Sequence, residues 1–394
     1  MSQRNLSVLG IVLIAVLSVS IVTTIDWLGN FHSTSEFFVG VEFAYNESAG
    51  EVEELVDDLK AMVDKVKTYT NLFVIGSIEI TFNQTALDEA CDYVVGSGLN
   101  LIVFFTDSQK YNYTAVGDGQ IDNSTIFDWM VEAKQKYGDK FLGIYRYDEP
   151  GGNQLDQADM IVENATDYAD AATQYVTNLG IIVEYYLNYA PRVFTADYEL
   201  YWFDYKAEYT AVFTEFGWNH SRPLHIGLCR GTAKAHNKDW GAIVTWTYDR
   251  PPYIESGREL YNDMVLAYKT GAKYVVIFNY APEVSEYGIL ADEHFGAIED
   301  FWNYVNSNPQ DRGTIKGEVA YVLPKDYGFG FRQPKDSIWG FWSGDDLSPK
   351  VFDDTNLLVM QYGSRLDIVY DDAEFIDGVR SRYDNLFFWN ETGS

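Results

Sequence analysis

The chain is poor in the residues that build disulfides, metal centres and nucleotide sites. It has two cysteines, Cys91 and Cys229, each in a segment with helical spacing, so we expect two buried free thiols and no disulfide framework. The five histidines show no HExxH or clustered spacing, which leaves a zinc site without support. No GxxxxGK[ST] loop, strand-linked GxGxxG or GxSxG elbow occurs. We therefore expect no metal, no cofactor, no nucleotide and no acyl-transfer chemistry.

Positive charge is also scarce. The 394 residues include 28 Lys and Arg against 59 Asp and Glu, which gives a formal net charge of −31 at pH 7. Nucleic acids and anionic lipid surfaces are polyanions, so this imbalance argues against both as partners. Because 47% of the residues are hydrophobic and 16% aromatic, the chain can bury a large core, and the composition excludes a disordered protein.

One apolar segment near the N-terminus differs from the rest of the chain. Residues 6–25 carry no charge, and at ~1.5 Å rise per residue such a stretch can cross a ~30 Å hydrocarbon core. Arg4 precedes it, which favours a cytoplasmic N-terminus and places Asp26 and all later residues on the far side. No A-x-A-like cleavage site follows, so we expect a membrane anchor over residues 1–30, with secretion after cleavage as the alternative.

N-x-S/T sequons give independent support for export. A single match carries little weight, but a series along one chain is typical of a glycosylated surface protein. We therefore expect an extracytoplasmic, cell-surface glycoprotein. The sequons lie at Asn46, Asn83, Asn112, Asn123, Asn164, Asn219 and Asn390.

Short apolar, β-branched or aromatic runs recur at intervals of roughly 30 to 40 residues, room for one strand, one helix and two loops. The runs are apolar on both faces, as in a parallel sheet covered by helices. Eight such units predict an α/β fold, a (β/α)8 TIM barrel over residues 31–310, with an open doubly wound sheet as the alternative. The runs are FFVGVEF from Phe37, NLFVIGS from Asn71, NLIVFFT from Asn100, FLGIYRY from Phe141, IIVEYYL from Ile181, AVFTEFG from Ala211, AIVTWTY from Ala242 and YVVIFNY from Tyr274.

A different pattern follows the predicted barrel. EVAYVLP from Glu318 is typical of a strand, LSPKVFDDTNLLVMQYG from Leu347 of a helix, and LDIVYDD and LFFWN of two further strands. These segments predict a small C-terminal α/β lobe over residues 311–394. We expect the Gly-rich aromatic stretch 327–342 within it to form a rim of a substrate cleft, with a subunit contact as the alternative.

Catalytic side chains of a TIM barrel lie at the C-terminal ends of the strands. In this chain those positions are acidic and aromatic. Sugar rings pack on Trp and Tyr, sugar hydroxyls bond to Asp, Glu, Asn and Arg, and glycosidic cleavage requires a carboxyl pair. For any one carboxylate, an ordinary polar group or helix cap at a barrel mouth is the better explanation, whereas the set as a whole favours carbohydrate processing. The expected sugar-binding residues are Glu42, Tyr45, Arg146, Tyr186, Asn188, Trp218, Trp246, Tyr248 and Tyr280.

The end of the fourth run, IYRYDEPGG, resembles the Asn-Glu-Pro signature of a large clan of β/α-barrel glycoside hydrolases. The resemblance implies that Glu149 is the acid/base. TEFGW at 214–218 looks like the nucleophile motif of that clan, which implies that Glu215 is the nucleophile. In the clan the nucleophile ends strand seven, whereas TEFGW ends the sixth run, and the seventh ends in TWTYD with Asp249. Asp249 is therefore the alternative partner of Glu149, and Asp148 replaces the usual Asn.

The adjacent Asp148 and Glu149 are also similar to the Asp-Glu pair of hexosaminidase-type barrels. That resemblance implies that Glu149 is the acid/base and that Asp148 orients the acetamido group of the substrate as nucleophile. Both schemes make Glu149 the proton donor, which requires a raised pKa. The sequence thus predicts a glycosidase acting on a carbohydrate substrate. A surface barrel that binds glycans without cleaving them is the alternative of another class.

Overall fold

The computed structural model describes residues 36–45, 52–106, 123–280 and 284–391. The predicted anchor at 6–25 and the sequons at Asn46 and Asn112 lie outside these ranges. Within them, no helix combines the length and the apolar character needed to cross a membrane. The elements described below all belong to one unit, residues 38–394.

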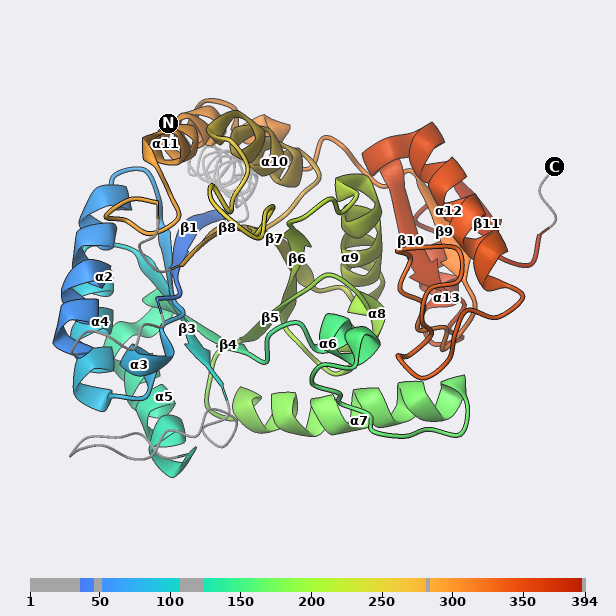
Figure 1. Cartoon of the computed structure of the whole chain (residues 1–394), viewed down its shortest axis with the longest axis horizontal. Coiled ribbons are helices and arrows are strands. Elements are labelled where there is room, and N and C mark those ends of the chain that lie inside the picture. The colour runs from blue at the N-terminus through green and yellow to red at the C-terminus, as the bar shows by residue number, and fades with distance from the viewer. Residues whose placement is uncertain (1–35, 46–51, 107–122, 281–283, 392–394) are drawn as a thin grey trace, which may run out of the picture. The chain divides into compact units, whose positions relative to one another are not determined.

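Eight parallel strands close into a barrel in chain order (Figure 1). The barrel closes where β1 pairs with β8, and in that register Glu42 lies opposite Phe278. Stacked rings such as those of Phe194 and Phe213 fill the interior. The predicted (β/α)8 barrel is confirmed, and the doubly wound alternative is wrong. The strands are β1 Phe38–Phe43, β2 Leu72–Ile75, β3 Asn100–Phe105, β4 Phe141–Arg146, β5 Val193–Asp197, β6 Ala211–Phe216, β7 Asp239–Val244 and β8 Tyr274–Asn279.

Helices surround the barrel (Figure 1). The longer ones form where apolar residues recur at helical spacing, and capping groups stabilise several of their first turns. In α10, for example, Ser256 and Glu259 form a capping box. The helices are α2 Val52–Val66, α3 Ile78–Thr81, α4 Gln84–Gly96, α5 Asn123–Tyr137, α6 Pro150–Asp156, α7 Tyr168–Leu187, α8 Tyr201–Lys206, α9 Arg222–His236, α10 Gly257–Lys269 and α11 Asp292–Ser307.

The predicted fifth strand is wrong. IIVEYYL from Ile181 belongs to the long helix α7, and β5 is the later run Val193–Asp197. A short run of β-branched and aromatic residues has the same composition in a strand and in a buried helix, and only the longer context separates them. Tyr175, Leu179 and Val183 are buried at intervals of one helical turn, which marks the helix. Tyr186 and Asn188 are therefore not at the end of a barrel strand.

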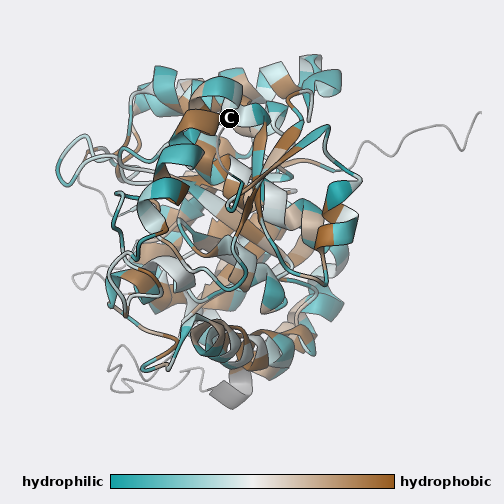
Figure 2. Cartoon of the chain, turned by 90° about the vertical axis from the view of Figure 1, so that its right-hand side faces the viewer, coloured by the Kyte–Doolittle hydropathy of each residue, from teal (hydrophilic) through white to brown (hydrophobic). Residues whose placement is uncertain are grey.

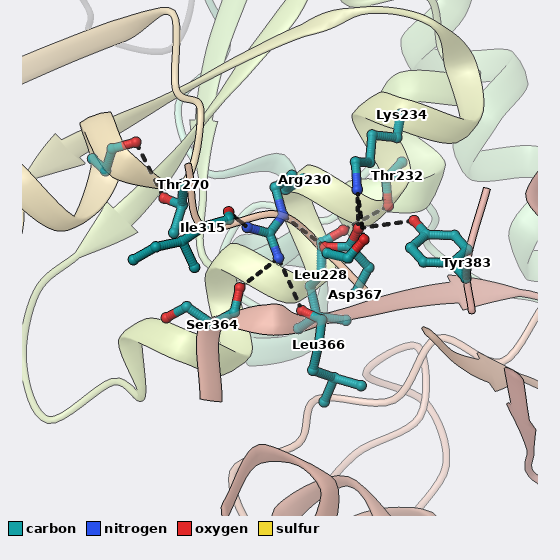
Figure 3. A network of polar contacts seen from close by, with 12 residues as sticks. Leu228, Arg230, Thr232, Lys234, Thr270, Ile315, Ser364, Leu366, Asp367 and Tyr383 are labelled. Atoms are coloured by element: carbon teal, nitrogen blue, oxygen red, sulfur yellow. Dashed lines mark hydrogen bonds and ion pairs between the residues drawn. The ribbon is translucent and has the colours of Figure 1, made fainter. Parts of the chain in front are cut away.

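A three-stranded parallel sheet in the order β10-β9-β11 follows the barrel. Figure 2 views the chain from the side of this sheet and shows brown, apolar segments flanked by teal, polar ones. β10 packs against α9 so closely that a Cβ added to Gly231 would lie 2.6 Å from the carbonyl oxygen of Ile368. The buried carboxylate of Asp367 also pairs with Arg230 and Lys234 of α9 (Figure 3). The elements are β9 Val319–Leu323, α12 Ser348–Tyr362, β10 Leu366–Tyr370, α13 Ile376–Arg380 and β11 Asn385–Phe388.

The aromatic stretch 327–342 does not form a rim of the cavity at the barrel mouth. Trp339 is fully buried against Phe203, at 4.5 Å between ring centroids. The carbonyl oxygen of Trp339 accepts a hydrogen bond from Gln154 of α6 at 3.0 Å, and Arg332 pairs with Asp156 at the end of that helix. The stretch therefore stabilises α6, the helix that follows Glu149.

Candidate active site

A cavity of about 360 Å³ lies at the C-terminal ends of the barrel strands. Each of the eight strands, or the loop after it, contributes lining residues, so the cavity is where the active sites of this fold occur. Its walls are of two kinds. The carboxyl side chains are Glu42, Asp148, Glu149, Asp159 and Glu215, and the aromatic ones are Phe104, Tyr145, Tyr147, Trp246, Phe278 and Tyr280.

Glu149 lies in a strained turn directly after β4. Tyr147 and Glu149 both have left-handed backbone angles, with φ of 66° and 50°. For residues other than glycine such angles cost about 1–3 kcal/mol each, and they cluster at functional sites. The N–H of Glu149 donates to the carbonyl of Ala196 at 3.0 Å, and Pro150 then begins α6 with a φ suited to the helix. This turn positions Glu149 at the cavity wall.

Asp197, at the end of β5, fixes the same turn from behind. Its buried carboxylate accepts the backbone N–H groups of Gly151 at 2.5 Å and Gly152 at 2.9 Å, and those of the two residues that follow it. A Cβ on Gly151 would lie 2.8 Å from this carboxylate, so the approach requires glycine. Burial raises the pKa of Asp197 to about 6, although these hydrogen bonds oppose the shift. The misplaced fifth strand hid this residue, for which the signal is the apolar run VFTAD ending in a carboxylate.

Glu149 and Glu215 form a carboxyl pair. Glu215 faces the barrel interior from β6, is buried, and shares a hydrogen bond with the carboxyl group of Glu149. Burial raises the pKa of both groups, and the charge of Asp148 raises both further. The interaction between the two carboxyls raises the pKa of Glu215 and lowers that of Glu149. Such a pair retains one proton when isolated carboxyls would have lost theirs. The proton belongs to the pair, and the deeper burial of Glu215 favours that side of it.

Asp148 and Tyr145 complete the acidic wall. The hydroxyl of Tyr145, which points into the barrel, donates to the carboxylate of Asp148. Asp148 itself is exposed at the cavity, and its negative charge contributes to the raised pKa values of Glu42, Glu149 and Glu215. One partly solvated carboxylate therefore affects the protonation of three buried ones.

Several of the expected sugar-binding residues meet at the cavity. Glu42, Trp246 and Tyr280 line it, and the rings of Trp246 and Tyr280 lie 5.7 Å apart between centroids. Arg146 also borders the cavity, but its guanidinium lies 5.2 Å from the ring centroid of Tyr186 and bonds to the carbonyl of Phe105. The charge of Arg146 is thus directed toward α7.

The remaining candidates lie elsewhere. The side chain of Asp249 is 76% exposed, pairs with the neighbouring Arg250 and does not line the cavity. Trp218 and Tyr248, each 45% exposed, are also outside the lining. Tyr45 is buried, stacks on Phe43 and accepts a hydrogen bond from Asn279. Tyr186 contacts Arg146, and Asn188 caps the end of α7. Among the residues in the described ranges, no three His, Cys, Asp or Glu side chains are placed to bind a metal ion.

No protein family and no curated protein matches the sequence. Solved structures do match the fold. One is the GH5_18 protein from Streptomyces cattleya in complex with Manβ1-4GlcNAc, with a TM-score of 0.55 and 13% identity over 90% of this chain and 99% of that one. The fold is shared with glycoside hydrolases. A second is α-L-fucosidase isoenzyme 2 from Paenibacillus thiaminolyticus, with a TM-score of 0.53 and 13% identity over 89% of this chain and 59% of the fucosidase. At this identity the likeness is one of fold.

Proposed function

We propose that the protein is a glycoside hydrolase that cleaves O-glycosidic bonds with the carboxyl pair Glu149 and Glu215. The observation that carries the proposal is this pair, two hydrogen-bonded carboxyls with raised pKa values at the end of β4 and on β6, beside a cavity with aromatic walls. Glycosidic cleavage requires one carboxyl to give a proton and the other to attack or to direct water. A shared barrel fold is consistent with this activity and does not establish it.

The separation within the pair favours retention of configuration. Retaining enzymes keep their carboxyls about 5–5.5 Å apart, whereas inverting enzymes leave about 6.5–9.5 Å for a water. The carboxyl groups of Glu149 and Glu215 lie close enough to interact directly, which leaves little room for a water between them and favours the closer class. In the proposed reaction Glu215 attacks the anomeric carbon while Glu149 gives its proton to the departing oxygen. Glu149 then takes a proton from water, which attacks the glycosyl-enzyme and releases Glu215.

The roles within the pair follow from depth. Glu149 is half-buried and lies in the loop after β4, nearer the mouth of the cavity, where we expect the leaving group to depart. Glu215 is buried and lies within β6. The proton that the pair retains must lie on Glu149 when the glycosidic bond breaks, and the contact between the two carboxyls is a route for it. The opposite assignment, with Glu215 as donor, is the alternative. The substrate-assisted scheme with Asp148 needs no Glu215, so the position of Glu215 beside Glu149 favours the two-carboxyl reaction.

The experiment is hydrolysis of aryl glycosides of both anomers by the wild type, Glu149→Gln and Glu215→Gln, with the exposed Glu132→Gln as matched control. Loss of the donor spares substrates whose leaving group needs no proton, so Glu149→Gln should retain far more activity on a dinitrophenyl glycoside than on a disaccharide. Glu215→Gln should lose both. The reverse pattern would exchange the roles. Glycan binding without turnover in any protein would leave a non-catalytic glycan-binding barrel.

We also propose that the barrel works outside the cytoplasm, anchored by residues 6–25. Support comes from the uncharged segment and from the sequons within the described ranges. Asn164, Asn219 and Asn390 are exposed, as a glycan requires, whereas Asn83 is half-buried and caps α4.

A further inference from the structure

Among the described residues that line the cavity, carboxyl groups far outnumber cationic side chains. Its carboxyl groups include Glu42, Asp148, Glu149 and Glu215. Arg146 is the one cationic side chain among the described lining residues, and its guanidinium lies against the ring of Tyr186, outside the barrel strands. A substrate that carries its own carboxylate would be repelled here, whereas a cation would be attracted.

Glu42 is the carboxyl for which the proposed reaction has no role. It is 5% exposed, points from β1 into the cavity, and lies opposite Phe278 of β8. Within the described part of the chain, its carboxyl group has no hydrogen-bond or ion-pair partner. Gly76 makes room for it, because a Cβ there would lie 2.5 Å from its Oε1. A buried carboxyl without a partner is destabilising, so a ligand that provides one is bound more tightly.

The surroundings of Glu42 favour a cationic ligand in particular. Asp148 faces it from the loop after β4, Tyr145 faces it from β4, and the ring of Phe278 occupies the paired position on β8. Burial and the charge of Asp148 raise the pKa of Glu42 to about 8, so the empty site retains a proton at neutral pH. An ammonium group would replace that proton, pair with both carboxylates and pack against an aromatic face.

We infer that the cavity selects a sugar with a free amino group, an unacetylated hexosamine, and that Glu42 and Asp148 bind its ammonium group. This inference rests on the proposed glycosidase function and adds the substrate class. A neutral hexose would leave Glu42 without a charged partner. An N-acetyl sugar has lost the positive charge, and a uronic acid would add another carboxylate to a cavity already lined by five carboxyl groups.

Binding tests the inference separately from turnover. Glucosamine, N-acetylglucosamine and glucose are titrated at pH 7 by calorimetry into the wild type, Glu42→Gln, Gly76→Ala and the control Glu132→Gln. We expect glucosamine to bind about tenfold or more tightly than the other two, and the preference to fall to near unity in Glu42→Gln. Gly76→Ala, which displaces the carboxyl without removing it, should weaken the preference in the same direction. Equal binding of the three sugars, or no binding of any, would overturn the inference.

Proton release provides a readout that a purely structural role for Glu42 would not change. Because the empty site is protonated, binding of an ammonium group should expel a proton, seen as a binding enthalpy that depends on the ionisation enthalpy of the buffer. Glu42→Gln should lose this dependence. Binding of Ca²⁺ or K⁺ in place of glucosamine would refute the inference and identify an inorganic cation site.

Turnover separates this inference from the proposed function. The matching nitrophenyl glycosides are compared by kcat/KM in the same proteins. Hydrolysis without a preference for the amino sugar would support the proposed glycosidase function and refute the inferred amino-sugar specificity. Selective binding of glucosamine without hydrolysis of any glycoside would refute the proposed glycosidase function and support an amino-sugar binding site.

Discussion

The carboxylate of Asp197 accepts the backbone N–H of Gly151 at 2.5 Å, and through this hydrogen bond the end of β5 determines the position of the turn that carries Glu149. The bond joins residues far apart in the sequence across neighbouring strands. Asp197 is a positioning residue, because its carboxylate contacts the backbone of the turn and does not line the cavity.

Asp197→Ala should therefore impair both stability and activity. It removes the acceptor of four backbone N–H groups, three of them buried, and each buried one left unsatisfied costs about 1–3 kcal/mol, so we expect a loss of about 3 kcal/mol or more in urea unfolding. A shift of the Glu149 turn should lower kcat by about tenfold to a hundredfold with little change in KM. The exposed Asp353→Ala on α12 is the control. Full activity in a folded Asp197→Ala protein would contradict the positioning role.

The raised pKa of Glu42 predicts a pH-dependent stability. The folded protein retains a proton on Glu42 that the unfolded chain releases above its ordinary pKa of 4.5, so stability should fall as pH rises from 4.5 to about 8. The contribution of one such group is at most about 1.4 kcal/mol per pH unit within that window. Glu42→Gln should flatten the dependence and become the more stable protein at pH 8. Urea unfolding at pH 5, 6, 7 and 8 measures the free energy of unfolding of both proteins. The same dependence on pH in the wild type and in Glu42→Gln would contradict the raised pKa of Glu42.

The Asp367 network should be essential to the packing of the C-terminal sheet on α9. The carboxylate is fully buried and bonds to Arg230, Lys234 and Tyr383 at 2.7–2.8 Å (Figure 3). Removing one partner of a buried ion pair leaves the other uncompensated and costs about 3–5 kcal/mol, the loss expected for Asp367→Ala.

The exposed pair of Arg365 and Glu318 gives the matched control for that measurement. Surface pairs contribute about 0–1 kcal/mol, so Glu318→Ala should have little effect on urea unfolding. Similar losses in Asp367→Ala and Glu318→Ala would show that burial of the network contributes nothing.

Two glycines in helices should respond in opposite ways to alanine. A Cβ at Gly231 of α9 would lie 2.6 Å from the Ile368 carbonyl, whereas one at Gly296 of α11 meets nothing within 4 Å. Alanine stabilises an open helix position by up to about 1 kcal/mol, the gain expected for Gly296→Ala. Gly231→Ala should be destabilising, because the backbone of β10 must move. Thermal unfolding compares them, and an equal gain at both positions would exclude the close contact.

Export predicts added mass. Purified from its native cells, the protein should exceed the mass of the bare polypeptide, and Asn164→Gln, Asn219→Gln and Asn390→Gln should each remove one glycan if that site is used. Asn306→Gln, an exposed asparagine outside any sequon, is the control. An intact mass equal to that of the bare chain would refute glycosylation.

The sequence alone was sufficient to predict the barrel and many of the carboxyl and aromatic residues that line its cavity. Strands such as β1, β4 and β6 are apolar on both faces and end at polar turns. This pattern is local, so it can be recognised in the sequence without knowledge of the fold. Since parallel barrel strands end at one face, Glu149 and Glu215 could be predicted to approach each other.

The tertiary structure decided the features that depend on contacts between residues distant in the sequence and on the direction in which a loop runs. IIVEYYL became helix because α7 packs its buried residues against the barrel, and this displaced Tyr186 and Asn188 from the predicted site. Asp249 faces solvent because the loop after β7 turns away from the cavity. The sequence does not indicate the direction in which such a loop runs. The hydrogen bond between Asp197 and Gly151 joins the end of β5 to the turn that follows the neighbouring strand β4. The raised pKa of Glu42 arises from burial and from the nearby charge of Asp148. Composition and period cannot encode such relations, because they are properties of residues adjacent in space and not along the chain.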